Sequence, residues 1–200
     1  MKRLSLYLFL LLFTLQTPSQ ADDIRDFQIE GMSIGDSALD YFSETEIKKN
    51  TIEEYSKRVK NSEFAITEFT FLSTFKVYDT IQIGYKINDK KYIIYSIEGI
   101  IFFEENIKDC YKKNKEISNE FAELFKDTKA VDVPKSKHPF DKSGNSFTKD
   151  IYFNFGSGDY VVVSCYDWSK KLNAQNFPDS LRIVMLTKEF NNWLENEAYK

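Results

Sequence analysis

The stretch "YKINDKKYIIYSIEGIIFF", residues 85–103, decides the fold of this chain. Apolar residues stand on both sides of a polar turn at residues 88–90, a pattern typical of two antiparallel strands joined by a hairpin. The apolar pattern after the turn suits a more buried strand with a bend near Gly99. We therefore expect an antiparallel meander built around this hairpin.

The residues before the hairpin predict two helices followed by further strands. Residues 67–77 and 81–87 alternate apolar and polar side chains, so each predicts a strand with one wet face. Two capping boxes, S-x-x-D and S-x-x-E, begin at Ser33 and Ser43, and each can satisfy free amides at a helix start. We predict a helix, a break and a second helix over residues 33–60.

The residues after the hairpin give the clearest amphipathic helix, over residues 105–127. Asn114 and Ser118 fall inside its apolar stripe, where they could contact a ligand or bond to nearby backbone. A long irregular segment rich in lysine follows, at residues 126–146. Beyond it the pattern predicts strands and a short C-terminal helix, at residues 147–155, 160–168, 181–188 and 190–198.

An internal similarity suggests a tandem duplication. Shifted by 68 residues, "YKINDKKYIIYSI" lines up with "FNFGSGDYVVVSC" without a gap. The chain could thus hold two pseudo-repeats of αβββ type, at residues 33–103 and 104–188. The alternative is that two aromatic hairpins resemble each other by convergence. Either way, the fold class expected is α+β, with antiparallel meander sheets packed on amphipathic helices.

The first residues have the pattern of a secretory signal peptide, residues 1–21. Lys2 and Arg3 precede a twelve-residue apolar run, and Ser19 with Ala21 matches a small-x-small cleavage motif. An uncleaved anchor is the alternative, but the run is shorter than the ~20 residues that span a bilayer. We expect one α+β domain over residues 22–200, exported to the periplasm or the extracellular space, with no transmembrane span in the mature chain.

Charge and cysteine content narrow the function classes. Removing Lys2 and Arg3 leaves 25 basic against 31 acidic residues, a net charge of −6 instead of −4. Nucleic acid is therefore not an expected partner, because binding to phosphates needs a basic surface. Cys110 and Cys165 could pair in an oxidising compartment, or stay as two buried thiols. Two cysteines with one histidine do not make a zinc site, and we expect no cofactor.

Three short motifs invite a catalytic or metal-binding interpretation. The triplet at residues 35–37 is similar to the first block of the GDSL-type serine esterases, but the later blocks of that family are missing. A capped helix start explains the triplet, and His138 is interpreted as an exposed loop histidine. The sequence "DKSGNS", residues 141–146, has alternating oxygen ligands without the later glutamate of a calcium loop, so we interpret it as a turn.

Aromatic and basic side chains favour a binding role. Tyrosines on the wet face could form a groove for a small apolar or sugar-like ligand, or they could pack under the helices. Lysines around the irregular segment could touch an anionic envelope component, or simply solvate the loop. The candidate ligand surface consists of Tyr92, Tyr152, Tyr160, Asn114 and Ser118, and the lysines are Lys126, Lys129, Lys135, Lys137 and Lys142.

Two resemblances bear on function. The opening "DFQIEGMSIGDSALDYFSETEIKKN", with the hairpin quoted above, resembles a family of small exported bacterial proteins without an assigned activity. The glycine-methionine-serine start followed by a meander is similar to envelope lipoproteins of the SmpA/OmlA kind, but the lipid-attachment cysteine is missing. We therefore expect an exported, noncatalytic envelope or periplasmic protein that binds a ligand or a protein partner. The alternative is a hydrolase with an unrecognised active site.

Overall fold

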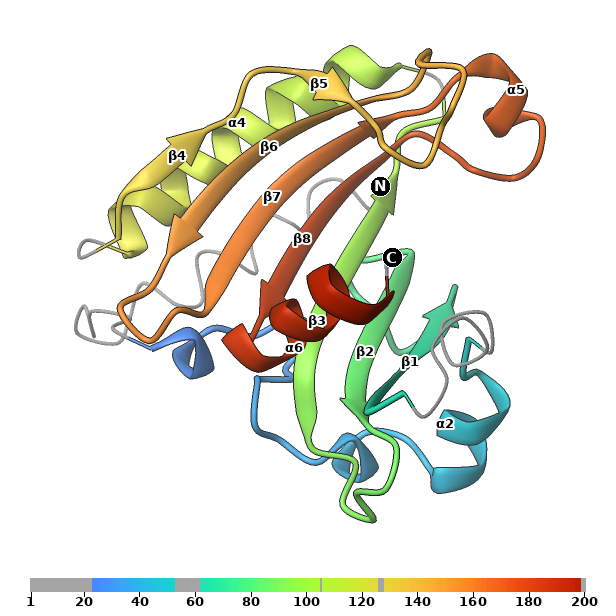
Figure 1. Cartoon of the computed structure of the whole chain (residues 1–200), viewed down its shortest axis with the longest axis vertical. Helices are drawn as coiled ribbons and strands as arrows, with labels where there is room; N and C mark the ends of the chain where they lie inside the picture. Colours follow the sequence, from blue (N-terminus) through green and yellow to red (C-terminus); the bar gives the residue numbers. More distant parts are fainter. Residues whose placement is uncertain (1–22, 53–61, 105, 126–127, 199–200) are drawn as a thin grey trace.

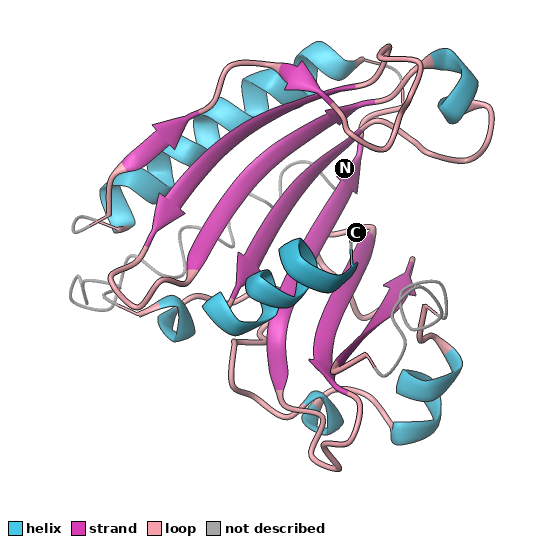
Figure 2. Cartoon of the chain, viewed as in Figure 1, coloured by secondary structure: helices cyan, strands magenta, loops and turns pink. Residues whose placement is uncertain are grey.

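The computed structural model describes residues 23–52, 62–104, 106–125 and 128–198. These residues form one antiparallel sheet of eight strands (Figures 1 and 2), so the antiparallel α+β prediction is confirmed. The sheet order is β1-β2-β3-β8-β7-β6-β4, and β5 also pairs with β6. The strands are β1 (Phe64–Thr70), β2 (Thr80–Lys86), β3 (Ile94–Phe102), β4 (Ala130–Asp132), β5 (Ser136–Lys137), β6 (Phe147–Asn154), β7 (Tyr160–Asp167) and β8 (Ser180–Leu186).

The sheet consists of two meanders joined at its centre. Strands β1, β2 and β3 follow one another in sequence and in space, and so do β6, β7 and β8. β3 and β8 join them in antiparallel register, with Ile97 opposite Met185. Both residues are buried because alternate residues of β1, β2, β3, β6, β7 and β8 face one shared hydrophobic core.

One long helix, α4 (Ile107–Leu124), lies against the core face of β6, β7 and β8 (Figure 1). The prediction of a helix near residues 105–127 is correct, and Asn106 caps its start by accepting from Lys108 N at 3.1 Å. Phe121 and Phe125 pack edge-on against Phe153 of β6.

A disulfide joins α4 to the sheet. Cys110 of α4 and Cys165 of β7 are bonded, their Cα atoms lie 6.1 Å apart, and neither side chain is exposed. The paired alternative of the sequence prediction is therefore the one that the structure adopts, and the buried-thiol alternative is wrong.

Short segments cover the core face of β1, β2 and β3. They include 3-10 turns at Ile24–Asp26 and Ala38–Asp40 and the helix α2 (Glu44–Lys49). The Ser43 capping box is confirmed. The helix expected from Ser33 is wrong: Ser33 N donates to the Asp36 carboxylate within a turn, and only a single 3-10 turn follows. The predicted residues 53–60 of the second helix, and the signal peptide, lie outside the described residues.

The strand predicted over residues 67–77 is displaced toward the N-terminus. β1 ends at Thr70 because Phe71 adopts a positive φ of 53° and leaves the sheet with its ring 69 % exposed. The following amides bond to a carboxylate instead of a strand: Glu30 accepts from the backbone N–H groups of Lys76, Val77 and Tyr78 at 2.7–3.2 Å. The carboxylate of Glu30, distant in sequence, therefore holds residues 76–78 outside the strand that their apolar–polar alternation predicts.

The second face of the sheet carries a smaller hydrophobic cluster at the end where β8 finishes. Helix α6 (Lys188–Trp193) and the π-helical turn Leu194–Ala198 confirm the predicted C-terminal helix. Phe190 lies over Gly84 of β2, where a Cβ atom would stand 2.3 Å from the ring. The short helix α5 (Lys170–Asn173) was not predicted, and it lies at the opposite end of β8 from α6 (Figure 1).

Candidate functional site

Two loops meet at the end of the sheet where β7 ends and β8 begins. One loop, residues 138–146, precedes β6, and the other, residues 168–179, contains α5 and joins β7 to β8. Figure 1 places the two loops together at this end. We call the pair the Trp168 end.

Aromatic rings gather at the Trp168 end. The ring of Trp168 lies 4.4 Å from His138, 5.6 Å from Phe177 and 6.2 Å from Phe140, measured between centroids. Phe140 and Phe177 also contact each other at 5.7 Å. Trp168 is only 7 % exposed, whereas Phe140 and Phe177 are 48 % and 37 % exposed. A buried indole therefore supports two rings that face solvent.

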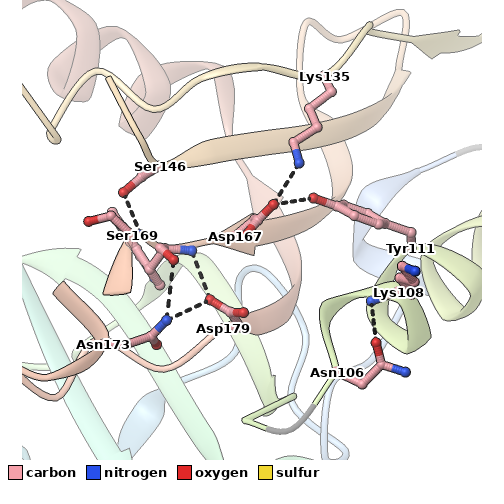
Figure 3. Close-up of polar contacts among 10 residues, drawn as sticks. Asn106, Lys108, Tyr111, Lys135, Ser146, Asp167, Ser169, Asn173 and Asp179 are labelled. Atoms are coloured by element: carbon pink, nitrogen blue, oxygen red, sulfur yellow. Dashed lines mark hydrogen bonds and ion pairs between the residues drawn. The ribbon is translucent and has the colours of Figure 1, made fainter. Parts of the chain in front are cut away.

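Hydrogen bonds hold the second loop in place (Figure 3). The backbone N–H of Trp168 donates to Asp179 Oδ1 at 2.8 Å, and Asn173 Nδ2 donates to the carbonyl of Trp168 at 3.2 Å. Burial raises the pKa of the Asp179 carboxyl, although the N–H of Trp168 opposes this effect. The N–H of Trp168 is thus tied to the residue before β8, and its carbonyl is tied to α5.

Asp141 organises the first loop and connects it to the second. Its carboxylate accepts from Ser146 Oγ at 2.6 Å and from Ser143 N at 2.9 Å, and these hydrogen bonds hold the pKa of Asp141 well below its usual range. Ser146 Oγ in turn accepts from Ser169 N at 2.9 Å (Figure 3). The interpretation of residues 141–146 as a turn is confirmed, because Gly144 N donates to Asp141 O.

A second polar cluster anchors this end to α4. Asp167 accepts from Tyr111 Oη at 2.8 Å and from Lys135 Nζ at 2.6 Å, as Figure 3 shows. Tyr111 belongs to α4 and Lys135 lies just before β5, so three separate segments meet at one carboxylate. Burial raises the pKa of the Tyr111 hydroxyl. The negative charge of Asp167 is thus compensated by the positive charge of Lys135.

Three lysines lie in the same two loops as the exposed rings. Lys142, Lys170 and Lys171 are exposed, and none of them forms an ion pair with a residue that the structure describes. Lys142 Nζ donates to the carbonyl of Pro139. A shallow pocket of about 470 Å³ separates Lys170 and Lys171 from the first loop, and its other lining residues are Ser143, Asn145, Trp168 and Ser169. We call Phe140, Phe177, Lys142, Lys170 and Lys171 the aromatic–lysine patch.

His138 is half-buried under this patch, so the prediction of a freely exposed loop histidine is wrong. Its ring contacts Tyr166 and Trp168, and its Nδ1 accepts from Phe140 N at 3.2 Å. Burial, and next the charge of Arg182, lower the pKa of His138 from its usual 6.5. Because the folded protein binds a proton on His138 less readily than the unfolded chain does, the free energy of unfolding depends on pH. The stability is fully present above pH 6.5, where the ring is neutral in both states, and it is lost as the pH falls through the lowered pKa.

Ser37 is a capping residue. Its Oγ accepts from Leu39 N at 3.3 Å and donates to the carbonyl of Lys91 at 2.6 Å. The helix start predicted for residues 35–37 does not form, and Ser37 instead caps the single 3-10 turn Ala38–Asp40. Its hydroxyl is thus engaged with backbone on both sides.

The five residues expected to form a ligand surface lie in different places. Tyr152 and Tyr160 do lie together, with ring centroids 5.9 Å apart, and Tyr160 Oη donates to Asn191 of α6. Tyr92 is buried in the main core. Asn114 and Ser118 are buried in α4, and Asn114 Nδ2 donates to Val163 O at 2.7 Å. The backbone-bonding alternative for Asn114 is therefore correct.

The two rings of the aromatic–lysine patch were missed at the sequence level, as were Lys170 and Lys171, whereas Lys142 was among the lysines expected to touch an anionic component. Phe140 and Phe177 stand in irregular segments, where neither a helical nor a strand period marks them, and Trp168 was placed at the end of the strand predicted over residues 160–168. The available signal was their context, because "KHPFDK" and "WSKK" place large rings beside lysines in loops. Rings in loops must find cover from other loops, which a local pattern does not reveal.

Comparison of the chain with protein-family models, with curated protein sequences and with solved structures found no significant match. Within the described residues, no helix has both the length and the apolar character needed to cross a bilayer. The same part of the chain holds no group of three or more His, Cys, Asp or Glu side chains suited to a metal ion. The function is therefore inferred from the geometry of this chain alone.

Proposed function

We propose that this chain is an exported, noncatalytic binding protein and that the aromatic–lysine patch is its docking surface. The observation that carries the proposal is a pair of solvent-facing rings, Phe140 and Phe177, supported by the buried indole of Trp168. Exposed apolar rings of this kind are stabilised when a partner covers them. Lys142, Lys170 and Lys171 lie in the same two loops, and none of them forms an ion pair with a described residue, so they complement an anionic group.

The rigidity of the two loops supports a docking role. Asp141 and Asp179 hold the loops through hydrogen bonds to Ser146 and to the N–H of Trp168. Rings on loops that are already ordered lose little conformational entropy when a partner binds. The patch is thus prepared for contact, unlike a mobile loop that happens to carry aromatics.

Two contacts favour binding over catalysis. A serine nucleophile needs a base within hydrogen-bond reach, whereas the Ser37 hydroxyl donates to the carbonyl of Lys91. His138 accepts at Nδ1 from Phe140 N and faces aromatic rings, an arrangement that suits a packing residue. These contacts support the noncatalytic interpretation over a hydrolase.

Export is supported by the buried disulfide between Cys110 and Cys165. Such bonds persist in oxidising compartments, which fits the signal-peptide pattern of residues 1–21 and an envelope or periplasmic location. The resemblance of the opening to small exported bacterial proteins points the same way.

The tandem duplication belongs to this proposal as a hypothesis of origin. A shift of 68 residues carries β2 onto β6 and β3 onto β7. An outer strand flanks each hairpin, β1 beside β2 and the short β4 and β5 beside β6. An ancestral hairpin with one flanking strand would account for both halves.

A fluorescence titration with anilinonaphthalenesulfonate, an anionic aromatic probe, tests the docking surface. We expect the folded chain to bind the probe and the Phe140→Ser/Phe177→Ser variant to bind it at least tenfold more weakly. The matched control is Leu39→Ser/Ile87→Ser, since both residues are similarly exposed aliphatics outside the Trp168 end. Equal binding by the patch variant and the wild type would show that the patch is not the docking surface. Circular dichroism verifies that each variant is folded.

A further inference from the structure

We propose that the partner of the aromatic–lysine patch is the anionic headgroup surface of a lipid bilayer. This inference rests on the docking role proposed above and names its partner. Phe140 and Phe177 would enter the boundary between headgroups and acyl chains, while Lys142, Lys170 and Lys171 would contact lipid phosphates. Apolar rings beside lysines are the combination that binds a protein to a membrane surface without crossing it.

Charge favours an anionic surface. The Trp168 end, residues 138–146 and 168–179, carries Lys142, Lys170 and Lys171 against Asp141 and Asp179, whereas the whole chain has a net charge of −4. Both aspartates accept hydrogen bonds from the loops themselves. The Trp168 end is therefore locally cationic on an acidic protein, so an anionic surface attracts this end and repels the rest.

The small apolar area favours a bilayer over a protein partner. At about 200 Å² per ring, the exposed fractions of Phe140 and Phe177 amount to roughly 170 Å². A specific protein interface buries about 800 Å² on each partner and requires a matching shape. A bilayer requires no matching shape, and attachment to it scales with the apolar area buried and with the attraction of cations to anionic lipids.

The position of the rings suits a flat surface. Phe140 lies in the first loop and Phe177 in the second, and both loops lie at one end of the sheet (Figure 1). Their centroids are 5.7 Å apart, so both rings can enter the same small area of membrane together. The underlying bonds from Ser169 N to Ser146 and from Trp168 N to Asp179 (Figure 3) keep the two loops in this relation.

Sedimentation with lipid vesicles tests the inference, using the oxidised, disulfide-bonded chain. The probe is phosphatidylcholine vesicles containing one quarter phosphatidylglycerol, compared with pure phosphatidylcholine. We expect binding to the anionic vesicles only, and weaker binding at about 1 M than at about 0.1 M salt because the Debye length shortens. Each lysine near an anionic membrane contributes about fivefold in affinity, so Lys170→Glu/Lys171→Glu should lose at least about 25-fold.

The chain supplies a matched control for the charge reversal. Lys90 and Lys91 are also consecutive, exposed lysines, and they lie in the β2–β3 hairpin outside the Trp168 end. We expect Lys90→Glu/Lys91→Glu to bind anionic vesicles as the wild type does. An equal loss in both variants would mean that overall charge and not the patch drives binding, and would overturn the inference.

The remaining outcomes separate the two proposals. Absence of vesicle binding, with probe binding still dependent on Phe140 and Phe177, would overturn the lipid inference and leave the docking surface for a protein partner. Loss of both would overturn the docking surface itself. Binding to anionic vesicles that Phe140→Ser/Phe177→Ser does not weaken would also overturn the inference, because the rings would then play no part.

Discussion

The two halves of the sheet bury the same face under different covers. The half formed by β6, β7 and β8 lies under one helix of 18 residues, α4, which a disulfide ties to β7. The half formed by β1, β2 and β3 lies under short pieces between residues 24 and 51, in which Phe42 stacks on Phe69 at 3.9 Å and Thr67 Oγ1 donates to the carbonyl of Ile47. A single core can thus be closed by one long element or by several capped turns.

The difference shows where local stability originates. The α4 half combines a long apolar stripe with a covalent bond, whereas each piece over the β1 half depends on its caps and on a few buried side chains. We therefore expect the α4 half to be the last region to exchange its amide hydrogens. The β1 half should open first.

Loss of the disulfide should produce the largest change and bring the two halves closer in stability. The Cys110→Ala/Cys165→Ala variant should lose about 4 kcal/mol of unfolding free energy. In the variant no bond links these two positions, 55 residues apart, so the unfolded chain gains conformational entropy. Urea unfolding measures the total, and hydrogen exchange should show faster opening of α4. An unchanged urea midpoint would mean that packing alone holds α4.

A methyl group at Gly84 should lower the stability of the β1 half, because it would meet α6 on the sheet face away from the short N-terminal segments. The Cβ atom of Gly84→Ala would stand 2.3 Å from the Phe190 ring, and overpacking of this kind costs about 1–3 kcal/mol. Gly156→Ala is the control, because a Cβ there meets nothing within 4 Å. Thermal unfolding of both variants checks the prediction. Equal loss in the two would mean that glycine backbone freedom and not ring contact is responsible.

Removal of the Ser43 cap should give the smallest change and the most local one. Ser43→Ala removes the acceptor of Glu46 N in α2, which should cost about 1 kcal/mol. Hydrogen exchange should accelerate in α2 and leave α4 unchanged. Thr45→Ala, an exposed substitution inside the same helix, should not accelerate exchange, because alanine favours a helix more than threonine does. Faster exchange in α4 as well would mean that the two covers open together.

The periodic parts of the molecule were predictable from sequence. Alternation located β2, β6, β7 and β8, and the apolar stripe located α4 to within a few residues. Each of these elements turns one side toward the core, so its apolar residues recur at a regular spacing in the sequence. The pairing of Cys110 with Cys165 was one of two alternatives, and only the packing of α4 on β7 decides it.

The remaining parts depend on contacts that a local pattern does not contain. Glu30 binds the amides of residues 76–78 from more than forty positions away, so these residues do not continue the strand that their alternation predicts. The short β4 and β5 form only because β6 offers them an edge. The aromatic–lysine patch likewise exists because two separate loops meet over Trp168. The sequence of either loop does not indicate that the other lies beside it.

The central position of β8 has a consequence for the order in which the chain folds. β8 is the last described strand in sequence, yet it separates β3 from β7, and Ile101 finds its partner only at Leu181. During synthesis, which starts at the N-terminus, β3 and β7 form before β8. Each then has an unpaired edge that can pair with another chain. Such distant pairing closes slowly. Aggregation during biosynthesis is thus a hazard until residue 186 is in place, and a truncation before residue 180 would make that hazard permanent.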